Sequence, residues 1–264
     1  MWFELCRGFC DGKREGIGEM STVAGVIQAR MGSSRLPGKS LARVCMNFSL
    51  LELVMLRVRK TEMMDMVILA TSKERDCDPL VELADRLGIL TVRGCEMDVL
   101  SRFVEVIQQY NPDIVVRICA DNPLIDPVEI DKLISFFQEN QFDYAANNTP
   151  ACGLPDGIGC EIIRSSTITK IATKALDNGY REHVTSYITS HPDEYSIGWL
   201  EANQKLWCPD LKLDIDTQED LVRIQEFCSS LAEVNAPYWT AEEIILNAQE
   251  INDKGCSFYE NSRD

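Results

Sequence analysis

Short apolar runs alternate along the first half of the chain with stretches in which apolar residues recur every three or four positions. The runs predict buried strands, and the spaced positions predict amphipathic helices. We expect strands at 23–27, 66–72 and 89–94 and from 113 onward, and helices at 50–60, 76–87, 98–110 and 127–140. This alternation predicts an α/β fold with a mostly parallel sheet and helices on both faces.

The alternation weakens after Asp143, where turn residues separate short apolar pieces, as in a hairpin or an excursion from the main fold. In this half we expect strands at 195–200 and 211–216, and helices at 166–178, 181–190, 217–231 and 240–252. Thr217 suits the cap of its helix, with Asp220 at the third position. Residues 1–20 lack a clear period and predict a loose N-terminal extension, so that 21–264 is expected to form a single domain.

Composition narrows the class of protein. The formal net charge of −16 argues against binding to nucleic acid or to an anionic membrane surface. No apolar run reaches the roughly 20 residues that a membrane helix needs. The eleven cysteines are scattered, several of them inside apolar runs, and residues 1–20 lack the pattern of a secretory signal peptide. We therefore expect reduced thiols and a cytoplasmic protein.

The loop that follows the first strand concentrates positive charge in an acidic chain. It contains Gly32 and Gly38 together with three cations, Arg30, Arg35 and Lys39. Small residues allow backbone N–H groups to approach phosphate oxygens, and cations balance their charge, so the loop predicts a phosphate site. The alternative is a surface loop whose cations are merely solvated.

The spacing of the two glycines separates this loop from a P-loop, which has four residues between its glycines. Gly32 and Gly38 enclose five residues, and one of them, Pro37, lacks an N–H to donate. A kinase or ATPase of the P-loop class is therefore disfavoured. The fingerprint G-x-G-x-x-G is also absent, which removes the usual dinucleotide interpretation.

Carboxylates at strand ends supply a second signal. Asp121 ends the fourth expected strand, and Asp214 and Asp216 alternate along LKLDIDT, which predicts that both point to the same face. Such oxygens are the ligands that Mg²⁺ prefers. The alternatives are a turn cap for Asp121 and a solvated strand face for the other two. Together with the cationic loop, the carboxylates predict phosphoryl or nucleotidyl transfer.

Several motifs occur in a fixed order, among them VIQARMGSSRLPGKSL, VVRICADNPLIDPVEID, PDGIGCEI and LKLDIDTQEDL. In this order, over Val23 to Phe227, the chain resembles the SpsF-like spore coat polysaccharide cytidylyltransferases and, more distantly, the CMP-sialic acid and CMP-Kdo synthetases. The resemblance implies a Rossmann-like nucleotidyltransferase fold, CTP as donor, Mg²⁺ as cofactor and a sugar or sugar acid as acceptor. It also implies a homodimer formed through a small excursion within residues 144–207.

The resemblance also implies roles for individual residues. Catalysis is expected of Arg30, Lys39, Asp121 and Asp216. Metal binding is expected of Asp121, Asp214 and Asp216. The nucleotide is expected to contact Ala29, Arg30, Met31, Gly32, Arg35, Lys39, Thr71, Arg93 and Arg117. The acceptor is expected to contact Asp156, Glu161, Arg181 and His183, although a lone histidine is more often structural. The family has a glycine turn after its GK-x-L segment, and RVCMNFSLLEL lacks one, which leaves the start of the helix at Leu50 open.

These residues predict a Mg²⁺-dependent cytidylyltransferase for surface polysaccharide or glycan synthesis. A hydroxyl of the acceptor attacks the α-phosphorus of CTP, a CMP-sugar forms and pyrophosphate leaves. Two alternatives stay open at this point. One is a nucleotidyltransferase with another base or with a phosphorylated or phosphonate acceptor. The other is a non-catalytic polysaccharide-assembly protein that keeps the fold for binding.

Overall fold

The computed structural model describes residues 21–253, and the expected extension over 1–20 lies outside the described residues. Its centre is a seven-stranded sheet in the order β5-β4-β1-β6-β8-β7-β9. The strands are β1 (Val23–Gln28), β4 (Met66–Ser72), β5 (Leu90–Gly94), β6 (Ile114–Cys119), β7 (Tyr144–Ala146), β8 (Glu161–Arg164) and β9 (Ile197–Trp199). Only β8 runs antiparallel to its neighbours in this sheet. The predicted mostly parallel α/β fold is confirmed.

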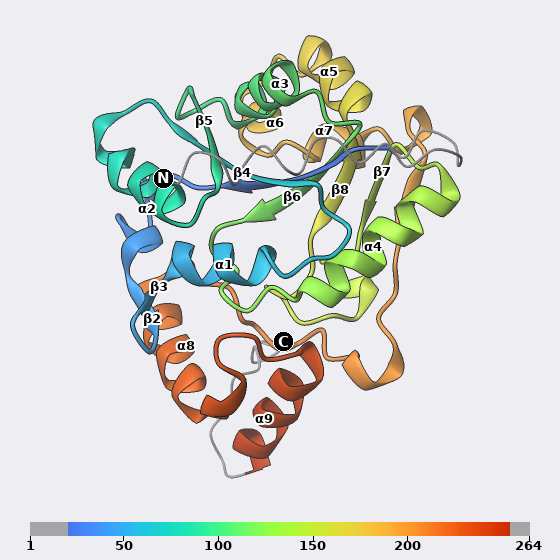
Figure 1. The fold of residues 1–264 in the computed structure, drawn as a ribbon. Helices are drawn as coiled ribbons and strands as arrows, with labels where there is room; N and C mark the ends of the chain where they lie inside the picture. Colours follow the sequence, from blue (N-terminus) through green and yellow to red (C-terminus); the bar gives the residue numbers. More distant parts are fainter. Residues whose placement is uncertain (1–20, 254–264) are drawn as a thin grey trace, which may run out of the picture.

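Helices cover both faces of the sheet, as Figure 1 shows. One face carries α1 (Leu50–Val58), α2 (Asp78–Arg86) and α4 (Pro127–Asn140), and the other carries α3 (Val99–Tyr110) and α5 (Ser165–Lys174). The alternation of side chains along β1 divides them between two cores: Val23 and Ile27 pack with α1 and α4, while Ala24 and Val26 pack with α3. A strand that is buried on both faces must be apolar throughout, which is why the apolar runs in the sequence predicted these strands correctly.

A third core lies beyond α1, at the bottom of Figure 1. It is built from a hairpin, β2 (Arg43–Cys45) and β3 (Phe48–Ser49), together with α8 (Gln218–Ser230) and α9 (Ala241–Asp253). The start of α1, left open by the sequence, is fixed by Ser49. The Ser49 hydroxyl accepts from the N–H of Glu52, and the Glu52 carboxylate accepts from the N–H of Ser49, which is a capping box.

Arg57 on α1 joins this third core to the sheet. Its side chain is fully buried and donates to four backbone carbonyls, those of Ile125 (2.8 Å), Leu124 (3.2 Å), Pro237 (2.6 Å) and Trp239 (2.8 Å). The first two carbonyls belong to the segment after β6, and the last two to the segment before α9. One side chain therefore holds together three segments that are far apart in the sequence.

Two predicted elements in the second half differ from the structure. The helix expected over 181–190 is broken into α6 (Asn178–Glu182) and α7 (Ser186–Ser190), because His183 leaves helical geometry and its carbonyl accepts instead from the N–H and hydroxyl of Ser186. The strand expected over 211–216 is not formed; within it, Lys212 makes an isolated bridge with Asp156. Its alternating apolar residues are buried in the third core, so the alternation reflects packing against α8 and α9.

The remaining elements are short 3₁₀ helices: η1 (Lys39–Leu41), η2 (Arg75–Cys77), η3 (Pro150–Cys152), η4 (Pro192–Glu194), η5 (Gln204–Leu206) and η6 (Glu233–Asn235). Across residues 21–253, every helix is too short or too polar to cross a bilayer.

Candidate active site

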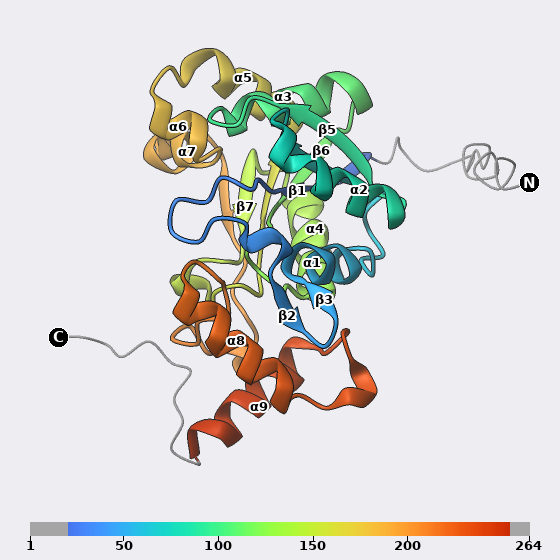
Figure 2. The same cartoon turned by 90° about the vertical axis from the view of Figure 1, so that its left-hand side faces the viewer.

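The loop between β1 and η1 folds back on itself at the carboxyl end of the sheet. The N–H groups of Ser33 and Gly38 both donate to the carbonyl of Met31, at 2.9 and 3.1 Å, which draws the two arms of the loop together. Gly38 has a φ of 75°, a left-handed geometry that favours glycine. Figure 2 shows the loop projecting from the body of the molecule after β1. The loop turns back at Gly38 and so places Lys39 at the carboxyl end of the sheet.

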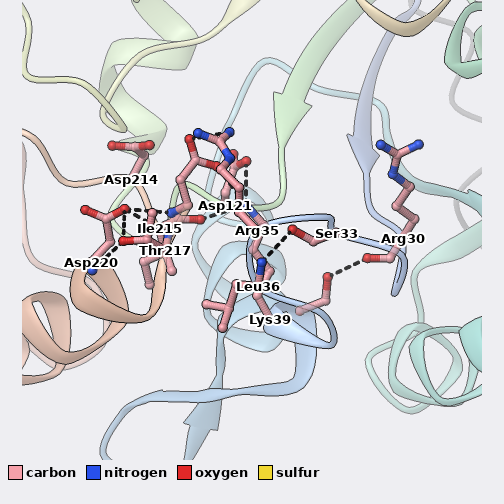
Figure 3. A network of polar contacts seen from close by, with 12 residues as sticks. Arg30, Ser33, Arg35, Leu36, Lys39, Asp121, Asp214, Ile215, Thr217 and Asp220 are labelled. Carbon is pink, nitrogen blue, oxygen red and sulfur yellow. Dashed lines mark hydrogen bonds and ion pairs between the residues drawn. The ribbon is translucent and has the colours of Figure 1, made fainter.

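Lys39 is the centre of the polar contacts drawn in Figure 3. Its ammonium lies 3.1 Å from a carboxylate oxygen of Asp121, 3.1 Å from one of Asp216 and 2.7 Å from the carbonyl of Ile215. Burial lowers the pKa of Lys39, but the two carboxylates outweigh burial and raise the pKa above its ordinary value. The ammonium therefore stays charged, and it links the loop after β1, the loop after β6 and the segment before α8.

Asp216 is presented by the start of α8. Arg35 pairs with its second oxygen at 2.8 Å, while the Asp220 carboxylate accepts from the N–H groups of Asp216 (3.1 Å) and Thr217 (2.9 Å). Thr217 caps α8 by accepting from the N–H of Asp220, so the predicted cap is confirmed as one half of a capping box. Ile215 also donates to the carbonyl of Asp121 at 2.9 Å, which fixes the spacing between the two loops that carry the carboxylates.

Replacing Asp220 with asparagine is expected to destabilise the protein by about 2 kcal/mol at neutral pH. Burial raises the pKa of Asp220, but hydrogen bonds from Arg223 and from the backbone of Thr217 and Asp216 outweigh it and hold the pKa well below its usual range. A carboxylate whose pKa is lowered by folding stabilises the folded protein at pH values above its unfolded-state pKa of about 3.9. This stabilisation is lost as the pH falls below that value toward the folded-state pKa. Urea unfolding should therefore show a gap between wild type and Asp220→Asn that shrinks below about pH 4. The exposed Asp85→Asn is the matched control, and a gap that is constant between pH 6 and pH 3 would contradict the assignment.

Asp214 does not join this cluster. It is 8% exposed, its nearest cation is Lys212 at 3.8 Å, and one carboxylate oxygen has no hydrogen-bond partner among the described residues. Burial and the nearby charge of Asp156 raise its pKa to about 7. The strand at 211–216 on which the prediction of a shared face for Asp214 and Asp216 rested is not formed, so the shared face stays a prediction.

The carboxylates can be tested for their fit to a metal ion. Within residues 21–253, no group of three or more Asp, Glu, His or Cys side chains is arranged to hold one. Asp121 and Asp216 nevertheless converge on one point, since both lie 3.1 Å from the Lys39 ammonium. Mg²⁺ in nucleotide enzymes is bound through one or two carboxylates plus substrate phosphates and waters. The pair fits such an ion, provided that a phosphate-bearing substrate supplies the other ligands.

A cavity of about 220 Å³ opens over this cluster. Seven predicted residues line it: Ala29, Arg30, Arg35, Lys39, Asp121, His183 and Asp216. Nine others do not line it: Met31, Gly32, Thr71, Arg93, Arg117, Asp156, Glu161, Arg181 and Asp214. The structure therefore brings together the cations and carboxylates expected of a phosphate site, and places most of the residues expected at the base and the acceptor elsewhere.

Arg117 and Glu161 form a buried ion pair across β6 and β8. Arg117 also donates to the side-chain carbonyl of Gln28 at 3.0 Å, and Glu161 accepts from the hydroxyl of Tyr144 at 2.7 Å. Buried charges need partners of this kind. Arg117 and Glu161 thus reach the cavity only indirectly, through Gln28, which does line it.

Other predicted residues are held by neighbours outside the cavity. Arg93 donates to the carbonyls of Ser72 and Glu74 and pairs with Asp78 at 2.7 Å. Arg181 pairs at 2.6 Å with Asp98, the cap of α3. Thr71 is fully buried in β4, and Asp156 borders a separate small cavity beside Lys212. A Cβ on Gly32 would lie 2.1 Å from a carboxylate oxygen of Glu96, so a larger residue there would require the Glu96 side chain to move.

The sequence-based prediction missed several lining residues: Gln28, Ser33, Ser34, Ser40, Val99, Arg102, Cys119, Ala120 and Glu182. Glu182 pairs with Arg30 at 2.8 Å, and Arg30 also donates to the carbonyl of Glu96 at 3.2 Å. Glu182 lies between Arg181 and His183, the two residues of this segment that the sequence predicted at the acceptor. Val99 and Arg102 open the helix that follows β5, and the rule that ligands bind beyond the carboxyl ends of strands could have found them.

Comparison with known proteins agrees with this geometry. The sequence profile of the cytidylyltransferase family matches residues 24–261. The spore coat polysaccharide biosynthesis protein SpsF of Bacillus subtilis (strain 168) is 36% identical over 231 residues, which cover 86% of this chain and 93% of that protein. The 3-deoxy-manno-octulosonate cytidylyltransferase of Chlamydia trachomatis serovar L2 is 33% identical over 122 residues, 46% of this chain and 47% of that enzyme.

Among solved structures, a cytidylyltransferase from Leptospira borgpetersenii serovar Hardjo-bovis superposes with a TM-score of 0.83 at 24% identity, over 93% of this chain and 100% of that chain. At this identity the likeness establishes the shared fold. The profile match and the relative that is similar over most of its length establish the family. The chain belongs to the cytidylyltransferase family, and it is an enzyme that transfers cytidylyl groups.

Proposed function

We propose that the enzyme transfers CMP from CTP to a hydroxyl of a sugar or sugar acid and releases pyrophosphate, in the synthesis of a surface polysaccharide or glycan. The observation that carries the proposal is the Lys39 ammonium between Asp121 and Asp216, at the mouth of a cleft that Arg30 and Arg35 also line. The names of the relatives support the pathway and the acceptor class: one is a spore coat polysaccharide biosynthesis protein, and another acts on an octulosonate.

In this reaction a bond forms between the acceptor oxygen and the α-phosphorus, and the bond from that phosphorus to the bridging oxygen of pyrophosphate breaks. Negative charge develops on the departing pyrophosphate. Arg30, Arg35 and Lys39 are placed to stabilise it, because all three line one cleft. Before substrate arrives their charges are balanced by Glu182, Asp216 and Asp121. The triphosphate supplies a second set of anionic partners for the same three cations.

Asp121 and Asp216 are the residues that we propose to hold Mg²⁺. The ion, when bound, neutralises charge on the phosphate oxygens. Asp214 is given no metal-binding role in this proposal, because its side chain is buried near Lys212 and does not line the cleft. Of the residues expected at the acceptor, His183 is the one that lines the cleft, and we propose that it faces the acceptor.

The function is tested by incubating the enzyme with Mg²⁺, each of the four nucleoside triphosphates and a panel of neutral sugars and sugar acids, with pyrophosphate as the readout. We expect release with CTP only, and its loss in Asp216→Asn. Circular dichroism of the variant should match wild type. Release with UTP or GTP alone would reject cytidylyl transfer, and release of inorganic phosphate instead would indicate a phosphatase or kinase reaction.

The proposal includes a homodimer formed through residues 144–207 and a cytoplasmic location. The end strand β9 supports the dimer, since it leaves Trp199 46% exposed at the edge of the sheet. The eight described cysteines, all free thiols, support a reducing compartment. Light scattering at micromolar concentration tests the dimer, and the mass of one chain would remove this part of the proposal.

A further inference from the structure

Arg102 is a buried cation on the wall of the cleft and forms no ion pair with a carboxylate among the described residues. It is 2% exposed, and its Nε and Nη1 atoms have no hydrogen-bond partner within residues 21–253. The ion pairs formed among those residues also leave it out. Burying a charge without a partner strongly destabilises a folded protein. An arrangement with this cost points to a ligand.

The fold makes room for this side chain at the cleft. Arg102 lies in the first turns of α3, and long helical side chains point back toward the helix N-terminus. Its stem crosses the end of β5, where a Cβ on Gly94 would lie only 2.7 Å from the Cγ of Arg102. Its neighbours Val99, Phe103 and Val106 belong to the apolar core, which would accept an apolar residue at position 102. A guanidinium is therefore not needed here for packing.

The charges around Arg102 are out of balance. Arg30 lines the same cavity, and its carboxylate partner, Glu182, is already used at 2.8 Å. Burial, followed by the positive charge of Arg30, lowers the pKa of Arg102. Cys77, Cys95 and Glu96 act in the opposite direction on this pKa but do not outweigh burial and Arg30, and the Nε and Nη1 atoms of Arg102 form no hydrogen bond with them. The guanidinium groups of Arg30 and Arg102 thus line one cavity, and Glu182 pairs with Arg30 alone.

We propose that Arg102 and Arg30 form an oxyanion-binding site in the cleft that both side chains line. Figure 3 shows Arg30 lying apart from Asp121. The inference rests on the proposed function: the oxyanion is a phosphate group of the nucleotide or the carboxylate of a sugar-acid acceptor. A guanidinium binds both with paired N–H donors. A neutral cytosine edge would satisfy the donors but leave the buried charge uncompensated, so an anion is favoured.

The site is tested by calorimetric titration of wild type, Arg102→Met and Arg102→Lys with inorganic pyrophosphate in metal-free buffer, with 3-deoxy-manno-octulosonate and with cytidine. Arg86→Met, which removes an exposed arginine on α2, is the matched control. We expect Arg102→Met to weaken binding of one of the two anions by about tenfold or more and to leave cytidine unchanged. Without ligand, Arg102→Met should melt a few degrees higher than wild type, because an unpaired buried charge is gone. Arg102→Lys should bind with intermediate affinity.

The titrations distinguish a phosphate from an acceptor carboxylate as the ligand of Arg102. Loss of pyrophosphate binding identifies a phosphate as the ligand, and loss of octulosonate binding alone identifies the acceptor carboxylate. Unchanged affinity for both anions overturns the proposal, and so does a loss for cytidine that equals the loss for pyrophosphate. If Arg102→Met does not fold, Arg102→Lys decides, and wild-type affinity in that variant overturns the proposal. If anions bind through Arg102 but no nucleoside triphosphate releases pyrophosphate, the proposed function is rejected and the anion site stands. If pyrophosphate is released but the Arg102 variants bind both anions as wild type does, the anion site is rejected and the proposed function stands.

Discussion

Replacing Lys39 with methionine is expected to lower kcat/KM for CTP by about a hundredfold to a thousandfold. Methionine keeps the length of the stem but removes the charge that lies 3.1 Å from both Asp121 and Asp216. Two effects add: the departing pyrophosphate loses a cation, and the two carboxylates repel each other without the ammonium between them. The loss should appear in kcat, because charge develops only as the bond breaks.

Lys205→Met serves as the control, since Lys205 is an exposed lysine paired with Glu242 on the surface of the third core. Steady-state pyrophosphate release measures both variants. Because the pKa of Lys39 is raised, the ammonium is fully present below its ordinary value of 10.5, and wild-type activity should show no basic limb from Lys39 up to that pH. Retention of more than about a tenth of wild-type kcat in Lys39→Met would contradict the role given to Lys39.

Replacing Arg57 with methionine is expected to destabilise the protein by about 3–5 kcal/mol. The variant leaves four buried carbonyls, those of Leu124, Ile125, Pro237 and Trp239, without their donor. An unsatisfied buried acceptor costs about 1–3 kcal/mol, partly recovered where water can enter. For a domain of this size such a change lowers the melting temperature by roughly 10 °C.

Arg59→Met is the matched control, because Arg59 lies two residues further along the chain and donates to one exposed carbonyl, that of Leu87. Calorimetry should show a near wild-type transition for Arg59→Met. The Arg57 variant should also lose activity below its melting temperature, since Leu124 and Ile125 follow the loop that carries Asp121. An Arg57→Met protein as stable as the control would show that the four contacts contribute little.

The sequence predicted the first half of the fold well, because parallel strands buried on both faces are apolar throughout and can be recognised without knowing their neighbours. The hairpin β2–β3 was missed since its turn uses Met46 at a φ of 51°, where turn chemistry leads one to look for glycine. At 211–216 the apolar residues alternated as in a strand but pack under α8 and α9. Periodicity reports which side chains are buried and not what they are buried against.

The residues of the candidate site also differ in how well the sequence could predict them. The cations of the loop and the two carboxylates Asp121 and Asp216 were predictable, because both sets follow sequence features that place them at one edge of the sheet. Arg93, Arg117 and Arg181 were not separable from them by residue type. Each is an arginine near a strand or helix end, and only the structure shows that carboxylates and carbonyls already occupy their donors.

The position of Asp216 in the chain affects when the active site can form during translation. The seven strands lie within residues 23–199, so the ribosome has delivered the whole sheet before it reaches Asp216. The carbonyls of Pro237 and Trp239 that Arg57 holds come later still. A nascent chain that carries the complete sheet therefore still lacks one of the two carboxylates and the closure of the third core. Nucleotide chemistry can therefore begin only after Asp216 has been added to the chain and has folded against the finished sheet.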